Sequence, residues 1–274
     1  MNLHRTQATL FKIYLNSGYR LAHRLDPVGF AAHLGLEGEE AEVIVNVSSV
    51  EIADFIGSLA WKRRRILEST VPITYGWVLD NEPDLITDFL SVAPLARSDD
   101  GNDLAVRFVA FLQESVHFYG TLPEALAEVG ELELMLVHAR GQQRPIADAE
   151  PMPGGDGFSA SSWETIFWKP RRTSVKGFST DPLPILLGKR DMRERGETSN
   201  ILVAPSLSDT TPTVLRLVPT VLGVLVNLTE PLSGKELLRR CRQDGKKISE
   251  TSLKTLLTSL VNMRVLDHKR MEAS

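Results

Sequence analysis

The residues TVLRLVPTVLGVLVNLTEPLSGKELLRRC (213–241) and SETSLKTLLTSLVNMRVLDHK (249–269) predict a strand, three helices and a closing strand in that order. Pro219 suits the first turn of the first helix, where a missing N–H costs nothing. Ser233 with Glu236 forms a capping-box pattern that opens the second helix. Ser249 opens the third. This order is typical of a winged helix, a fold that recognises other molecules.

The first half of the chain shows helical periodicity throughout. Apolar residues recur at helical spacing over 2–24, 48–69, 81–92, 104–119 and 122–142. Proline, glycine and serine then collect over 144–162 without periodicity, which marks a linker. We therefore expect an all-helical domain over 1–143, a linker over 144–162 and a second domain over 163–274.

The second domain begins with strand-like segments. Large apolar residues alternate with polar ones over 163–170 and 173–180, and 200–205 is a short apolar run. The charged segment 186–199, which lies between 173–180 and 200–205, is predicted to be a loop. The sequence thus predicts an α+β chain, in which a helical domain precedes a winged-helix-like domain with a small antiparallel sheet.

Composition favours a soluble, cytoplasmic protein. The 274 residues are 42% hydrophobic, carry a net charge of −4 and include one cysteine, Cys241. We find no signal peptide and no apolar stretch near the roughly 20 residues that a membrane span needs. Charge is uneven, with 15 acidic and 4 basic residues over 80–157 but 4 acidic and 10 basic over 233–270.

Motifs of a self-sufficient enzyme are missing from the sequence. The six histidines are scattered and show no metal-ligand spacing. There is no GxGxxG after a strand, no GxxxxGK[ST] and no GxSxG. We expect no metal, cofactor or catalytic residue in this chain, although an unfamiliar active site stays open as an alternative.

Two features are suited to recognition. The first is the run Lys62-Arg63-Arg64-Arg65, which fans around one helical turn; it is either a solvated surface or a contact for an acidic partner. The second is the predicted strand 213–217 with the third helix. Such a pair can accept a peptide as an added strand or place its helix in the major groove of DNA.

The predicted third helix is poorly suited to reading DNA, since it offers only Lys254 and Asn262 among serine, threonine and leucine. Positive charge gathers instead on the preceding helix and turn, which suits an acidic peptide. The set is Lys235, Arg239, Arg240, Arg242, Lys246 and Lys247. A DNA-binding regulator and a merely structural domain remain the alternatives.

Two parts of the chain resemble known families. VLRL (214–217), LSGKELL (232–238) and SLKTLLTSLVNMRVL (252–266) resemble the PqqD-like peptide-recognition element of ribosomal peptide biosynthesis. Residues 62–95 and AVRFVAFLQE (105–114) resemble the helical domain of the MbnC/HvfC-type partner proteins. The counterparts are Arg63–Arg65, Pro72, Phe89 to Pro94 and Arg107 to Leu112, and this second match covers roughly 50–115.

Together the two resemblances imply a partner subunit of a multinuclear non-heme iron-dependent oxidase, similar to TglI. Such a partner forms a heterodimer with the oxidase, which holds the iron, and helps to present a precursor peptide whose cysteine is oxidised. The TglI-like pathway to 3-thiaglutamate removes the β-carbon of a C-terminal cysteine. We expect the arginines Arg63, Arg64 and Arg65 to contact the oxidase. Residues expected to bind the peptide are Val214, Leu215, Arg216, Leu217, Leu253, Lys254 and Leu257.

Overall fold

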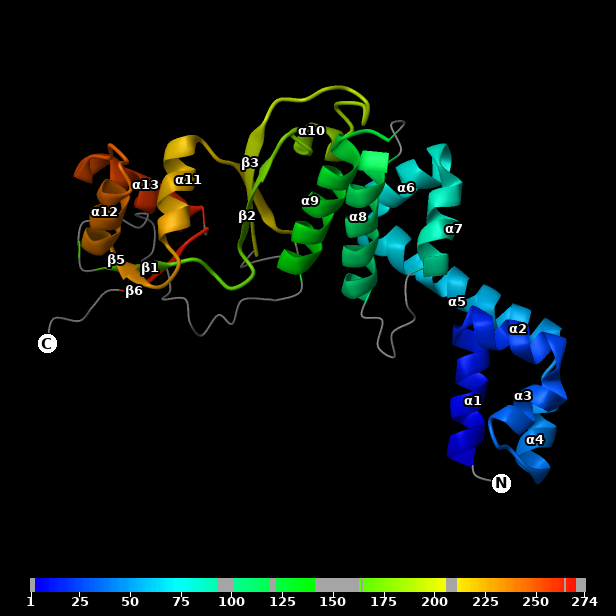
Figure 1. The fold of residues 1–274 in the computed structure, drawn as a ribbon. Coiled ribbons are helices and arrows are strands. Elements are labelled where there is room, and N and C mark those ends of the chain that lie inside the picture. The colour runs from blue at the N-terminus through cyan, green and yellow to red at the C-terminus, as the bar shows by residue number, and fades with distance from the viewer. Residues whose placement is uncertain are drawn as a thin grey trace, which may run out of the picture. The chain divides into compact units, whose positions relative to one another are not determined.

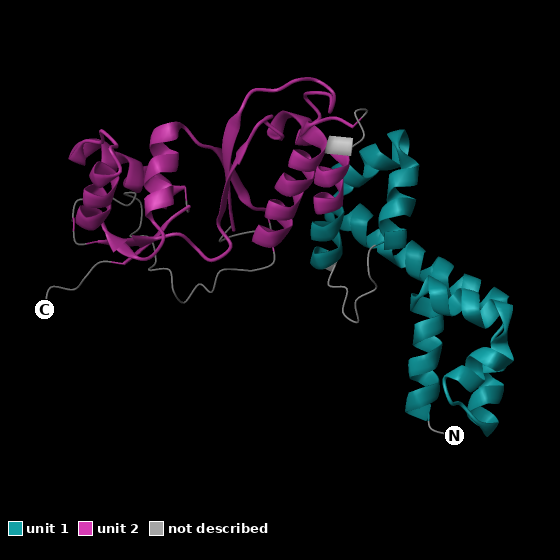
Figure 2. Cartoon of the chain, viewed as in Figure 1, with its two compact units in different colours: residues 1–108 teal, residues 109–274 magenta. Residues whose placement is uncertain are grey.

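A computed structural model describes residues 3–92, 101–118, 122–140, 163, 165–205, 211–263 and 265–269. Helices dominate, with short antiparallel strands in the second half, so the α+β expectation holds (Figure 1). The chain divides into two compact units, 1–108 and 109–274 (Figure 2). The expected linker 144–162 lies outside the described residues, and the expected domain boundaries stay a prediction.

The first unit is built from short helices around one long one. Its elements are α1 (Leu3–Leu15), α2 (Ser17–Leu25), α3 (Pro27–His33), α4 (Gly38–Val45), α5 (Ser49–Thr70), α6 (Pro72–Asn81), α7 (Pro83–Val92) and the first part of α8 (Gly101–Phe118). The long helix α5 starts at a complete capping box between Ser48 and Glu51, where the sequence places it.

The single helix expected over 2–24 is instead two helices, α1 and α2. Asn16 between them is extended, and its side chain accepts hydrogen bonds from the backbone N–H groups of Gly18 and Tyr19. An asparagine followed by Ser17 and Gly18 competes with helical hydrogen bonding, which ends one helix and caps the next. Apolar periodicity continues across the break and hides it.

The described residues of the second unit form two three-stranded antiparallel sheets. Its helices are the rest of α8, α9 (Ala125–Arg140), α10 (Leu183–Leu186), α11 (Pro219–Asn227), α12 (Gly234–Gln243) and α13 (Glu250–Asn262). Strands β2 (Ser174–Phe178), β3 (Ser199–Ala204) and β4 (Thr213–Arg216) form one sheet in that order. Strands β5 (Leu232–Ser233), β1 (Ile166–Trp168) and β6 (Asp267–Lys269) form the other, with β1 in the centre.

The β2–β3–β4 sheet is covered on both faces. Leu202, Ala204 and Leu217 belong to a core shared with α11, α12 and α13. On the opposite face, Ile201 and Val203 pack with residues of α9. Helices α9 and α11 accordingly lie on opposite sides of β2 and β3 in Figure 1. This arrangement leaves the two outer strands, β2 and β4, as the edges of the sheet.

Candidate functional site: the edge of strand β4

Strand β4 lies at an edge of its sheet. It pairs antiparallel with β3, with Val214 opposite Val203 and Arg216 opposite Ile201. Within the described ranges no strand pairs with its other side. An unpaired strand edge presents a row of backbone donors and acceptors that another chain can use.

The register identifies which backbone groups face outward. The Leu217 N–H donates to the Asn200 carbonyl oxygen at 2.7 Å, which extends the ladder beyond β4 by one residue. In an antiparallel pair, successive residues direct their backbone groups alternately toward the partner and away from it. Leu217 and Leu215 therefore bond to β3, while the N–H and C=O groups of Val214 and Arg216 point away from it.

The side chains of β4 alternate between the two faces of the sheet. Leu215 packs against the core formed with α11 to α13, and Leu217 is buried in it. Val214 packs against the cluster that includes α9. Arg216 is exposed, and its Nη2 lies 2.5 Å from Oδ2 of Asp181. The ion pair ties this guanidinium to Asp181, which lies just before α10.

Helix α13 contributes less to a peptide surface than the sequence indicates. Leu253 and Leu257 are 0% and 1% exposed and belong to the core, so a change at either position tests the fold rather than a surface. Lys254 is half-buried, with its Nζ 3.1 Å from Glu250 and 4.7 Å from the centre of the Trp163 ring. Strand β4 and helix α13 are also not among the closely packed pairs of elements in the described part.

Part of the positive charge of α12 is compensated by nearby acids. Arg239 donates to both carboxylate oxygens of Glu236, and Arg240 donates to Glu230 and Glu236. Hydrogen bonds from Arg239 and Arg240, with the charges of these groups, lower the pKa of Glu236 to about 2. The predicted capping box is only half formed: the Ser233 hydroxyl oxygen accepts a hydrogen bond from the Glu236 N–H, as predicted. The Glu236 side chain turns to the arginines, a contact that the cap pattern does not reveal.

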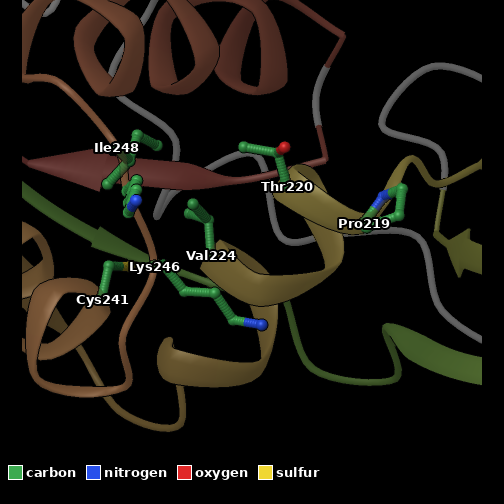
Figure 3. A pocket seen from close by; sticks show the side chains of 7 residues that line it. Pro219, Thr220, Val224, Cys241, Lys246 and Ile248 are labelled. Atoms are coloured by element: carbon green, nitrogen blue, oxygen red, sulfur yellow. The ribbon is translucent and has the colours of Figure 1, made fainter.

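A small cavity lies between α11 and the turn that joins α12 to α13 (Figure 3). Its volume is about 150 Å³, and the Cys241, Lys246 and Val224 side chains line it. Typical small-molecule sites measure roughly 300–1,000 Å³, so this cavity is too small for an ordinary ligand. Burial raises the pKa of the Cys241 thiol, which disfavours the reactive thiolate.

The three arginines of α5 occupy different environments. Arg63 is 5% exposed, and its Nη1 donates to the Leu90 carbonyl oxygen at 3.3 Å, near the end of α7. Arg64 is exposed. Arg65 is exposed, lies 3.3 Å from Glu68 and approaches the Trp61 ring. Of the three arginines expected to contact an oxidase, Arg64 and Arg65 are exposed and Arg63 is buried.

The described residues contain neither a metal-binding cluster nor a single membrane-spanning helix. No group of three or more histidine, cysteine or acidic side chains could hold a metal ion. No single described helix is long and apolar enough to cross a membrane. Helices α4 and α5 meet the length and composition criteria only when they are taken together, and the pair is bent by 72° at the break between them.

Comparison with known proteins adds no relative. No family model matches the chain, and no curated protein has detectable sequence similarity to it.

Proposed function

We propose that this chain is a non-catalytic partner protein that binds a peptide as an added strand beside β4. The observation that carries the proposal is the outward direction of the Val214 and Arg216 backbone groups on an edge that is unpaired among the described residues. An antiparallel peptide strand would form hydrogen bonds with the backbone N–H and C=O groups of Val214 and Arg216. Such backbone bonds supply affinity, while neighbouring side chains select the sequence.

The charge and apolar surface of β4 favour a peptide that carries both acidic and apolar side chains. Arg216 carries five N–H donors, so a guanidinium paired with one Asp181 oxygen retains donors for an acidic peptide side chain. Val214 and Leu215 are partly exposed and offer apolar contact on the two faces. We therefore expect a bound strand with an acidic residue beside Arg216 and apolar residues beside Val214 and Leu215.

The wider role that we propose follows the resemblance. The peptide would be a ribosomal precursor, and the helical unit would dock on an iron-dependent oxidase through Arg64 and Arg65 so that the precursor's cysteine reaches the iron. A TglI-like step toward 3-thiaglutamate is the pathway that we propose for it. The oxidase would carry the iron, and this chain would supply binding and orientation.

Two substitutions at one position test the peptide edge. Both Arg216→Pro and Arg216→Ala remove the ion pair with Asp181. Arg216→Pro also removes the outward N–H without breaking a bond to β3, whereas Arg216→Ala keeps that N–H. We expect Arg216→Pro to weaken binding of a synthetic strand peptide with this acidic and apolar pattern by about tenfold or more, because one lost backbone hydrogen bond in a desolvated strand pair is worth roughly 1–2 kcal/mol. Fluorescence anisotropy of the labelled peptide measures the change.

Two control variants distinguish loss of the β4 backbone bond from loss of the Arg216 side chain and from a change at the opposite sheet edge, β2. Arg216→Ala should weaken binding less than Arg216→Pro does, by about fivefold at most, because an exposed ion pair to the peptide contributes roughly 0–1 kcal/mol. Gly177→Pro alters the outer edge of β2 and should leave binding unchanged. Equal binding by Arg216→Pro and Arg216→Ala would reject the β4 edge, and tight, salt-sensitive binding to duplex DNA would identify a regulator instead.

A further inference from the structure

The first unit contains two adjoining hollows along α2 and α5. One measures about 550 Å³ and is lined by residues of α2 and α5 with Pro27 and Val47. The other measures about 680 Å³ and reaches from the turn between α1 and α2 to the end of α7. Ser17, Arg20 and Ile56 line both hollows. We refer to the joint surface as the α2–α5 trough.

Apolar side chains line the trough and remain open to solvent. Leu21 is 49% exposed, and Val92 at the far end is 69% exposed. Ile56 and Ile52 of α5 contribute the deeper apolar surface, with Ile52 buried. Exposed apolar surface that is gathered in a hollow marks an interaction site more often than isolated exposed residues do.

The charged residues that line the trough are all cationic. Arg20, Arg24 and Arg63 line it, and no aspartate or glutamate of the described chain does. Arg20 donates to the Tyr14 carbonyl oxygen at 2.8 Å, and Arg63 donates to that of Leu90. The bond to a neutral carbonyl group orients the Arg20 guanidinium without cancelling its charge, and Arg24 is exposed. The trough therefore combines an apolar floor with positive walls.

We propose that the α2–α5 trough binds an amphipathic helix of a partner protein, with acidic residues beside its apolar stripe. The described elements of this unit are all helices, so it offers no strand edge to satisfy the backbone of an extended peptide. A helix satisfies its own backbone and needs only apolar contact and charge complementarity from the trough. The inference concerns a surface other than β4 and does not require the partner to be an oxidase.

Two synthetic helices of opposite charge test this assignment on the full chain. Both are about five turns long and share one leucine stripe at helical spacing, flanked by glutamate in one peptide and by lysine in the other. We expect the glutamate peptide to bind about tenfold more tightly at low salt, measured by fluorescence anisotropy. Equal affinities, or no binding of either peptide, would overturn the proposal.

Matched variants locate the bound helix. Leu21→Glu and Arg24→Glu change exposed side chains of the trough and should weaken the glutamate peptide by about fivefold or more. Arg64→Glu makes the same charge change on α5 outside the trough and should have little effect. Arg216→Pro should leave this binding intact, which separates the trough from the β4 edge.

Self-association is the competing use of the same surface. Sedimentation velocity over a range of protein concentrations tests it with the unchanged chain and with Leu21→Glu. A monomer in both supports the proposal. A dimer that Leu21→Glu dissociates would assign the trough to a second copy of this chain and overturn the proposed partner helix.

Discussion

At the scale of single residues, side-chain type predicts chemistry, but environment decides whether that chemistry is available. Arg63 and Arg64 are neighbours in one basic run, yet Arg63 is buried against α7 and Arg64 is exposed. Helical geometry predicts that such a run fans around the helix, but not which arginine meets another element. Leu257 shows the same limit, because an apolar face does not reveal whether it lines a groove or fills a core.

Glu236 provides a pH test at this scale. Its pKa lies near 2, below the ordinary value of 4.5, so its contribution to stability is present above about pH 4.5 and is lost as the pH falls toward 2. Glu236→Gln should therefore destabilise the chain at neutral pH, and by less as the pH falls through this window. Urea unfolding at several pH values measures the difference, and a difference independent of pH would contradict the ion-pair account.

At the scale of elements, local capping signals predict helix starts well. Ser48, Pro219 and Ser249 place the beginnings of α5, α11 and α13, as the structure confirms. The break at Asn16 is missed, because the apolar pattern runs through it. Strand partners are missed as well: β6 closes a sheet with β1 and β5, and β4 joins β2 and β3. Pairing depends on residues far apart in sequence, which periodicity does not encode.

The packing of α9 tests where the second domain begins. Leu132 and Ala139 of α9 form a core cluster with Phe178, Ile201 and Val203 of the β2–β3–β4 sheet. A fragment of residues 163–274 lacks α9 and should expose that apolar face, whereas residues 122–274 should keep it covered. We expect the longer fragment to unfold cooperatively, and the shorter one to bind a hydrophobic dye and lose cooperativity.

Circular dichroism melts and dye fluorescence distinguish the two fragments. Equal stability would mean that α9 adds nothing to the sheet, and it would favour the boundary at 144–162 that composition predicts. A shorter fragment that fails to melt cooperatively would instead place α9 within the domain that contains β4.

At the scale of the whole molecule, the sequence predicts an α+β chain with a helical first half, and the structure agrees. The edge strand β4 is predictable from the sequence as a strand over 213–217, but the residues whose backbone groups point outward are not. They depend on the register with β3, which fixes Val214 and Arg216 as the residues that face away. The α2–α5 trough left no sequence signal, because its residues come from separate helices.

Amide hydrogen exchange with and without a bound peptide is the sharpest test of strand addition at β4. The N–H groups of Val214 and Arg216 point away from β3 in the free chain, while those of Leu215 and Leu217 are directed to β3. We expect the peptide to slow exchange at Val214 and Arg216 by about tenfold or more, with smaller changes at Leu215 and Leu217. Unchanged exchange at Val214 and Arg216 on a saturated complex, or protection on β2 instead, would contradict strand addition at β4.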